Sequence, residues 1–67
     1  MTIGEKLRKL RGNRPREEIA KEVGVSVSAL AMYELDERIP RDEIKVRLAN
    51  KYNVGVQELF FEQKCHD

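Results

Sequence analysis

The stretch REEIAKEVGVSVSALAMYE, residues 16–34, decides the fold of this chain. Ile19, Ala20 and Val23 lie at i, i+1 and i+4, which places three apolar groups on one face of a short helix. Gly24 follows at once, and glycine can take the left-handed conformation that ends a helix. The first half of the stretch therefore predicts a helix that stops at a tight turn around Gly24.

A second short helix is predicted directly after that turn. Ser26 offers a hydroxyl for the N-cap, and Leu30 and Tyr33 lie at i and i+3, where they form an inward apolar face. Ala20 is small enough to let the two helices cross at close range. The spacing of Ala20, Gly24 and Leu30 is therefore typical of a helix-turn-helix.

The residues of this motif resemble those of the Cro and phage-repressor type of helix-turn-helix proteins, the XRE family. The matching residues are Ala20, Gly24-Val25-Ser26, Leu30 and Tyr33-Glu34. Residues 2–11 look like the first helix of that family, residues 39–44 like the loop into its fourth helix and residues 54–61 like its fifth. The resemblance implies an all-α fold, a compact five-helix bundle with a central helix-turn-helix, which binds operator DNA, usually as a dimer. We expect this domain to span residues 1–62 and a flexible tail to follow at residues 63–67.

Length and composition exclude several classes of protein. Sixty-seven residues make one small domain, and five helices of that size leave little volume for a substrate cleft. The sequence has one histidine and no glycine-rich phosphate loop, so we predict that the protein is not an enzyme and needs no cofactor or small-molecule ligand. A single cysteine rules out an intramolecular disulfide, and no apolar run approaches membrane-spanning length. Both features favour a cytoplasmic protein.

Cys65 and His66 are two potential metal ligands near the C-terminus. They are adjacent, and they are the only cysteine and the only histidine of the chain. A zinc site needs three or four protein ligands, so we predict no metal site.

Charge is distributed unevenly along the chain, although the formal net charge is only +1. The basic residues that precede residue 17, against the single acid Glu5, are Lys6, Arg8, Lys9, Arg11, Arg14 and Arg16. A charge run of this kind is by itself most often a solvated helix face. Next to a helix-turn-helix it favours an anionic partner, because a DNA-binding domain needs a basic face rather than a basic total.

The outward side of the second motif helix carries the candidate base contacts, which are Val27, Ser28, Ala31 and Met32. The usual readers of purine edges in the major groove are Arg, Lys, Asn and Gln, and none of them stands at these positions. The three apolar residues can pack on thymine C5-methyl groups, and Ser28 can make one hydrogen bond. Two interpretations stay open: a thymine-rich site recognised by apolar contact and shape, or a protein interface. The basic flank favours the first.

Five residues around the motif are candidate phosphate contacts. In the family a Gln that contacts a phosphate commonly occupies the position of Arg16, so the resemblance implies this role for Arg16. Arg38 and Arg41 lie in the loop after the motif and can reach phosphates beside the second helix. Arg14 is a further candidate, and Ser26 can cap its helix and touch a phosphate at once.

Two acidic residues near the end of the motif have structural roles that the resemblance implies. An acid at the position of Glu34 commonly pairs with a basic residue elsewhere in the domain, and Arg8 or Arg11 can supply it here. The family usually has Gly where Asp36 stands. Asp36 must therefore adopt the backbone conformation of that glycine, or the turn differs.

Side-chain caps are predicted for the first and the fourth helix. Thr2 and Glu5 have the spacing of a capping box. Asp42 is predicted to be the N-cap of the fourth helix.

The last helix is the predicted dimer contact, through Val56, Leu59 and Phe61. Phe61 lies about 100° further round the helix than Phe60, so the two rings cannot point the same way. Either Phe61 covers a partner chain or it folds over the rim of its own core, and both interpretations stay open.

Together these patterns predict a sequence-specific regulator of transcription that binds double-stranded DNA through the major groove. The specific prediction is a repressor that binds a dyad operator as a homodimer. The alternative is a protein-interaction module with the same fold, such as an antirepressor, an adaptor or an antitoxin-like partner.

Overall fold

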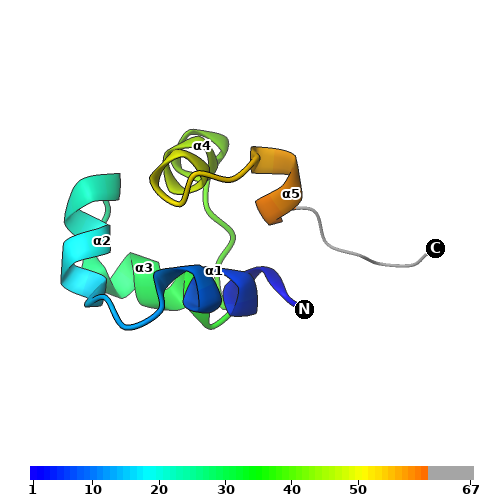
Figure 1. Ribbon diagram of the computed structural model, residues 1–67. Coiled ribbons are helices and arrows are strands. Elements are labelled where there is room, and N and C mark those ends of the chain that lie inside the picture. Colours follow the sequence, from blue (N-terminus) through cyan, green and yellow to red (C-terminus); the bar gives the residue numbers. More distant parts are fainter. Residues whose placement is uncertain (61–67) are drawn as a thin grey trace.

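The computed structural model describes residues 1–60, and within them the chain forms five α-helices (Figure 1). They are α1 (Ile3–Arg11), α2 (Arg16–Val23), α3 (Val27–Glu34), α4 (Asp42–Lys51) and α5 (Val56–Phe60). The predicted all-α five-helix fold is confirmed. In residues 1–60 no helix has both the length and the apolar character needed to cross a lipid bilayer. The expectations for Phe61 and for residues 63–67, which include Cys65 and His66, concern residues outside the described part of the chain.

The helices form a closed circuit around one core. α3 packs against α1 and α2, α4 packs against α2 and α5, and α5 returns to α1. In Figure 1, α1 and α3 run side by side beneath α4, while α2 stands at the left end of the molecule. This circuit leaves one side of α3 without a covering helix, so that side can contact a partner.

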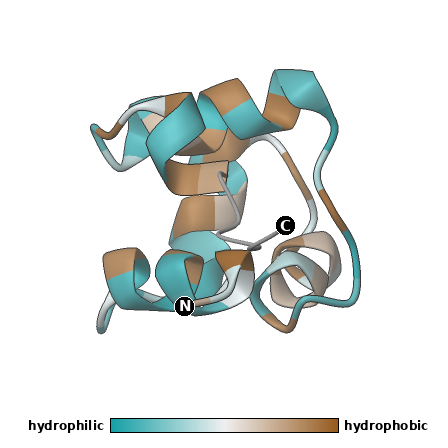
Figure 2. Ribbon diagram, turned by 90° about the vertical axis from the view of Figure 1, so that its right-hand side faces the viewer, coloured by the Kyte–Doolittle hydropathy of each residue, from teal (hydrophilic) through white to brown (hydrophobic). Residues whose placement is uncertain are grey.

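Buried hydrophobic side chains from all five helices and the α4 C-cap make the core. In the described part of the chain they are Leu7, Ile19, Ala20, Val23, Leu30, Tyr33, Leu48, Ala49, Tyr52 and Leu59. In Figure 2 several hydrophobic segments of the ribbon lie at the centre, where the helices meet. Burying one Leu, Ile or Val side chain contributes about 1.5–3 kcal/mol, so this core is the main stabilising term of a small domain.

The helix-turn-helix is formed as its sequence predicts. Gly24 adopts the left-handed conformation with φ 89° at the C-cap of α2, and its amide donates to the carbonyl of Ala20 at 2.8 Å. Ser26 is the N-cap of α3, and its Oγ accepts a hydrogen bond from the Ala29 amide at 3.0 Å. Arg47 on α4 donates from Nη1 to the carbonyl of Val23 at 3.2 Å. A cation at the C-terminus of α2 complements the helix dipole and fixes α4 to the turn.

Gly4 allows α1 to approach the end of α3 closely. A Cβ atom at this position would lie 2.3 Å from the carbonyl oxygen of Glu34, well inside van der Waals contact. The predicted capping box precedes this contact: Thr2 Oγ1 accepts from the Glu5 amide at 3.1 Å, and Glu5 Oε1 accepts from the Thr2 amide at 2.9 Å. A glycine in an otherwise amphipathic helix therefore marks a helix–helix contact here.

Asp36 adopts a positive φ of 63°, so it takes the backbone conformation that suits glycine. Unlike glycine, Asp36 has a carboxylate that accepts two hydrogen bonds. Oδ2 accepts a hydrogen bond from the Thr2 hydroxyl at 2.7 Å, and Oδ1 accepts one from the Gly4 amide at 2.8 Å. These bonds satisfy a free amide in the first turn of α1 and connect the start of the chain to the loop after α3.

The predicted N-cap of α4 is wrong by one residue. Arg41 is the N-cap, in extended conformation with φ −65° and ψ 161°, and Asp42 is already the first helical residue. No side chain caps the helix there. Asp42 and Glu43 instead place two acids in the first turn, where the helix dipole favours negative charge.

Replacing Asp36 by Asn is expected to change how stability depends on pH. Hydrogen bonds from Thr2 and the Gly4 amide lower the pKa of Asp36 from its ordinary value of 3.8. Because the folded-state pKa is lowered, the carboxylate stabilises the fold fully above pH 3.8 and loses that contribution as the pH falls through the folded-state value. Asn also tolerates positive φ, but its side-chain amide has no group that titrates in this pH range.

Urea denaturation from about pH 7 down to about pH 3 measures this effect. The free energy of unfolding of the wild type should exceed that of Asp36→Asn most clearly at neutral pH. The difference between the two proteins should shrink below pH 3.8. Asp42→Asn is the matched control: that side chain is fully exposed and, within residues 1–60, interacts only with the helix dipole and a distant Lys45, so its difference from the wild type should be smaller than that of Asp36→Asn. A constant gap between wild type and Asp36→Asn would contradict the prediction.

Candidate nucleic-acid interface

The structure brings the predicted base contacts together on the uncovered side of α3. Val27 is 40% exposed, Ser28 is exposed, and Ala31 and Met32 are half-buried. The opposite side of the helix carries Leu30, Tyr33 and Glu34, which are all buried. The inward and outward assignments made from the sequence therefore match the fold, while the contacts of the outward residues with bases stay a prediction.

Ser26 stands where α3 begins. Its oxygen accepts the capping bond from Ala29, and the hydroxyl hydrogen remains available as a donor. The side chain is exposed. One serine can thus hold the helix end and donate to an anion at the same time, as its predicted phosphate role requires.

Glu34 is the centre of a buried ion cluster that joins three helices. Its side chain has 0% exposure. Arg11 of α1 donates to it twice, from Nε at 2.7 Å and from Nη2 at 3.0 Å, and Arg16 of α2 donates from Nε at 2.9 Å. Arg8 donates from Nη1 to the Glu34 carbonyl oxygen. The side-chain hydrogen bond to Glu34 raises the pKa of Arg11. We call Arg11, Arg16 and Glu34 the Glu34 cluster.

The cluster changes the expected position of Arg16. The resemblance implies that Arg16 faces a phosphate, and the structure pairs it with Glu34 while leaving its side chain 35% exposed. Arg16 also lines a shallow hollow together with Arg11, Glu17 and Val27, the first residue of α3. Arg11 and Arg16 together balance the charges of Glu34 and Glu17, so the hollow places two guanidinium groups beside the start of α3 without a net charge among these four residues. Arg16 is therefore near the start of α3 but already bound to a carboxylate.

Arg14 lies elsewhere. Its Nη2 donates to the Leu10 carbonyl at 2.9 Å and its Nε to the Arg11 carbonyl at 3.2 Å. Its guanidinium lies over the Tyr52 ring, 5.6 Å from the ring centroid. These contacts assign Arg14 to the C-terminus of α1 and to the end of α4, so the structure does not bring it together with the outward residues of α3.

A second basic hollow lies beside the turn of the motif. Arg38 and Arg41, both predicted phosphate contacts, line it with Gly24 and Tyr33, and Arg47 lies in the same hollow. In residues 1–60 no ion pair involves Arg38 or Arg41, whereas Arg47 pairs with Glu43 at 3.1 Å. The sequence reasoning missed Arg47. The sequence shows only that Arg47 follows Glu43 at i, i+4. This spacing predicts an ion pair on the surface of a helix but not the contact of Arg47 with α2.

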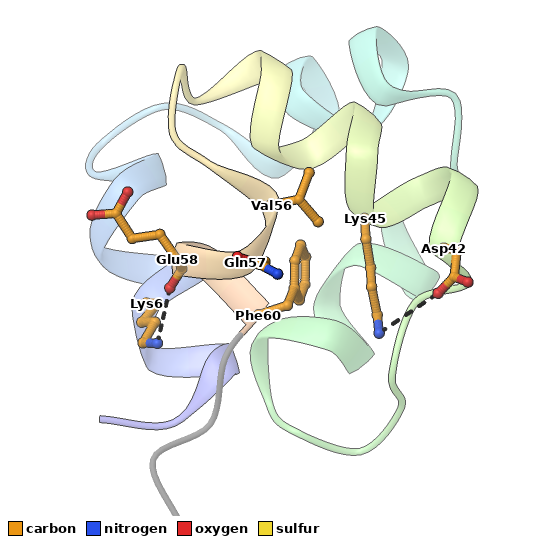
Figure 3. Close-up of a pocket in the computed structure, with 7 residues that line it drawn as sticks. All are labelled: Lys6, Asp42, Lys45, Val56, Gln57, Glu58 and Phe60. Atoms are coloured by element: carbon orange, nitrogen blue, oxygen red, sulfur yellow. Dashed lines mark hydrogen bonds and ion pairs between the residues drawn. The ribbon is translucent and has the colours of Figure 1, made fainter.

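The α5 residues predicted to form a dimer differ in exposure. Leu59 is 2% exposed and belongs to the core, so it is removed from the candidate dimer contacts. Val56 is half-buried and lines an open hollow with Phe60, Gln57 and residues of α1 and α4 (Figure 3). At its rim the Lys45 ammonium lies 5.7 Å from the centroid of the Phe60 ring. Phe60 is thus partly accessible.

A comparison with protein families identifies the class that this geometry defines, a helix-turn-helix DNA-binding domain. A helix-turn-helix family model matches residues 5–59, which is most of the chain. The chain therefore belongs to the helix-turn-helix family of the Cro and phage-repressor type, whose members bind DNA and regulate transcription. A comparison with curated proteins found no match.

Proposed function

We propose that this DNA-binding regulator is a repressor that binds a dyad-symmetric operator as a homodimer. One observation carries the proposal: one arginine-lined hollow adjoins the amino end of α3, and a second lies beside the turn that precedes the helix. Arg11 and Arg16 line one beside Val27, and Arg38 and Arg41 line the other beside Gly24. Cations that flank an uncovered helix face suit a partner that offers a groove bordered by phosphates.

The arrangement suggests how the domain docks. α2 lies across the DNA backbone, and α3 enters the major groove with its amino end leading. Arg38 and Arg41 contact phosphates beside the groove, and Arg16 keeps its predicted phosphate role through the exposed part of its guanidinium. Val27, Ser28, Ala31 and Met32 then face the base edges. Occupation of a promoter in this way excludes other proteins and represses transcription.

A homodimer follows from the small size of the contact. One short helix spans too few base pairs to define a unique site, whereas two copies related by a two-fold axis contact half-sites about one DNA turn apart. α5 supplies the surface in this proposal, since Val56 and Phe60 are only partly covered beside an open hollow. Phe61 follows directly in the sequence and is retained as a predicted dimer contact.

Selection of bound duplexes from a random pool tests the proposal. The purified protein at moderate salt should enrich one sequence with dyad symmetry, and sedimentation should show two chains on one duplex. Enrichment of an asymmetric site by a single chain would contradict the dimer. Failure to enrich any sequence at low salt would contradict specific DNA binding itself.

Removing Arg38 or Arg41 is expected to weaken binding to all duplexes alike. Each phosphate contact releases condensed counterions, so Arg38→Ala and Arg41→Ala should each lower the slope of log affinity against log salt by about one. Neither change should disturb the fold, because both side chains are exposed and Arg41 caps α4 through its backbone alone. Fluorescence anisotropy across a salt series measures the slope.

Lys9→Ala is the control for these variants. It removes one positive charge from an exposed position that lies with Val54 and Glu58, next to α5 rather than α3. Its salt slope should equal that of the wild type. An equal loss of slope in Lys9→Ala would mean that net charge, and not the hollow beside Gly24, determines binding.

The apolar side of α3 supports one other function, a protein-interaction module. Val27 and the half-buried Ala31 and Met32 would suit a hydrophobic partner. The same salt series separates the two functions. Phosphate-driven association weakens steeply with salt, whereas an apolar protein interface hardly responds.

A further inference from the structure

Few hydrogen-bonding side chains of α3 are free to face a partner. Within Val27–Glu34 they are Ser28, Tyr33 and Glu34. Tyr33 is buried, and Glu34 is fully buried and held by Arg11 and Arg16. Ser28 is thus the one exposed hydrogen-bonding side chain of the helix. In Figure 2 the ribbon of α3, seen end-on at the lower right, is correspondingly pale to brown.

The neighbours of α3 do not replace the missing polar readers. The Ser26 oxygen is used by the helix cap, and Arg16 donates to Glu34. Arg38 and Arg41 belong to the loop after α3 and line the hollow beside Gly24. The bidentate contacts by which Arg, Asn or Gln distinguish purines are therefore not available from the outward side of this helix.

Among the groups that base pairs present in the major groove, the thymine C5-methyl is the apolar one. We propose that α3 recognises its operator chiefly by packing Val27, Ala31 and Met32 on C5-methyl groups, so that methyl positions determine sequence preference. The inference rests on the proposed DNA binding and names the chemistry of that same site. Ser28 adds one hydrogen bond. Cytosine methylated at C5 presents the same group in the same place and is recognised as a thymine substitute.

Replacing thymine by uracil in the selected duplex tests the inference, since uracil lacks only the C5-methyl. Each methyl that α3 covers should be worth about fourfold in affinity, and the symmetric pair in a dyad operator about fifteenfold. At the same positions a 5-methylcytosine–guanine pair should bind more tightly than a cytosine–guanine pair. Replacing purines by their 7-deaza forms, which lack the N7 acceptor, should have little effect at most positions.

A variant cycle shows whether α3 itself contacts the methyl group. In Val27→Ala the uracil penalty should fall toward onefold at one pair of symmetric positions and persist at the others. Val46→Ala is the matched control: it makes the same change at a residue of α4 that is 45% exposed, and its penalties should equal those of the wild type. Circular dichroism confirms that both variants fold.

The outcomes separate this inference from the proposed function. A selected duplex whose uracil forms bind as tightly as the parent would overturn methyl recognition and leave specific DNA binding intact. Uracil penalties that persist unchanged in both Val27→Ala and Met32→Ala would also overturn it, because the methyl would then act through DNA shape. Failure of any duplex to be selected would overturn the proposed function itself.

Discussion

Glu34→Gln is expected to lower the free energy of unfolding by about 3 kcal/mol. The substitution keeps the shape of the side chain and removes the charge that Arg11 and Arg16 share. Breaking a buried ion pair from one side costs about 3–5 kcal/mol, since the remaining charge loses its partner. The lower end applies here, because both guanidinium groups are partly exposed and can be hydrated. Urea denaturation at neutral pH measures the loss.

Glu43→Gln is the matched control for this prediction. Glu43 pairs with Arg47 at i, i+4 on the surface of α4, where both side chains are largely exposed. Such pairs contribute about 0.3–0.5 kcal/mol, so the control should be close to the wild type. If the two variants lost equal stability, the Glu34 cluster would be no more than a surface ion pair, and its assignment as a link between three helices would be wrong.

Gly4→Ala is expected to destabilise the fold by about 3 kcal/mol, the upper part of the usual range for overpacking. The added methyl meets backbone, 2.3 Å from the Glu34 carbonyl oxygen, and the Asp36 side chain lies at 2.9 Å. Neither neighbour is the free end of a flexible chain, because Asp36 is held by Thr2 and by the Gly4 amide. α1 must therefore move away from α3, which loosens the Arg8 and Arg11 contacts as well.

Gly55→Ala provides the comparison. A Cβ there would lie 3.8 Å from the nearest atoms of Glu58, an ordinary contact distance. Alanine stabilises the protein by restricting the unfolded chain, and it destabilises the protein because it is less favourable than glycine directly before a helix. These two effects nearly cancel, so stability should stay within about 1 kcal/mol of the wild type. Thermal or urea unfolding of the two variants side by side decides the matter, and a Gly4→Ala protein as stable as Gly55→Ala would refute the close approach.

The parts of the fold that depend on neighbouring residues were predictable from the sequence. The turn at Gly24, the Ser26 cap and the Thr2–Glu5 capping box are each contained in five residues or fewer, and all three are present. The same holds for the inward position of Leu30, which follows from helical periodicity alone. Errors at this level were small, as the shift of the α4 N-cap by one residue shows.

The contacts between distant residues were harder to predict, for a physical reason. Arginine is long and flexible, and its sequence position does not show which of several acceptors it reaches. Arg11 was one of two partners expected for Glu34, but the second pairing, with Arg16, depends on how α2 is oriented against α3. Arg14 reaches the carbonyls of α1 instead of a surface beside α3. Gly4 could not be recognised as a contact residue before the path of α3 was known.

The placement of Glu34 has a consequence for engineering. Residues that anchor α3 and residues that face outward do not overlap: Leu30 and Glu34 hold the helix from within, and Val27 and Ser28 project from it. The outward positions can therefore be exchanged in combinatorial libraries while the anchor stays constant. A scaffold of this size, in which the proposed reading surface can be exchanged, is suited to the construction of orthogonal genetic switches.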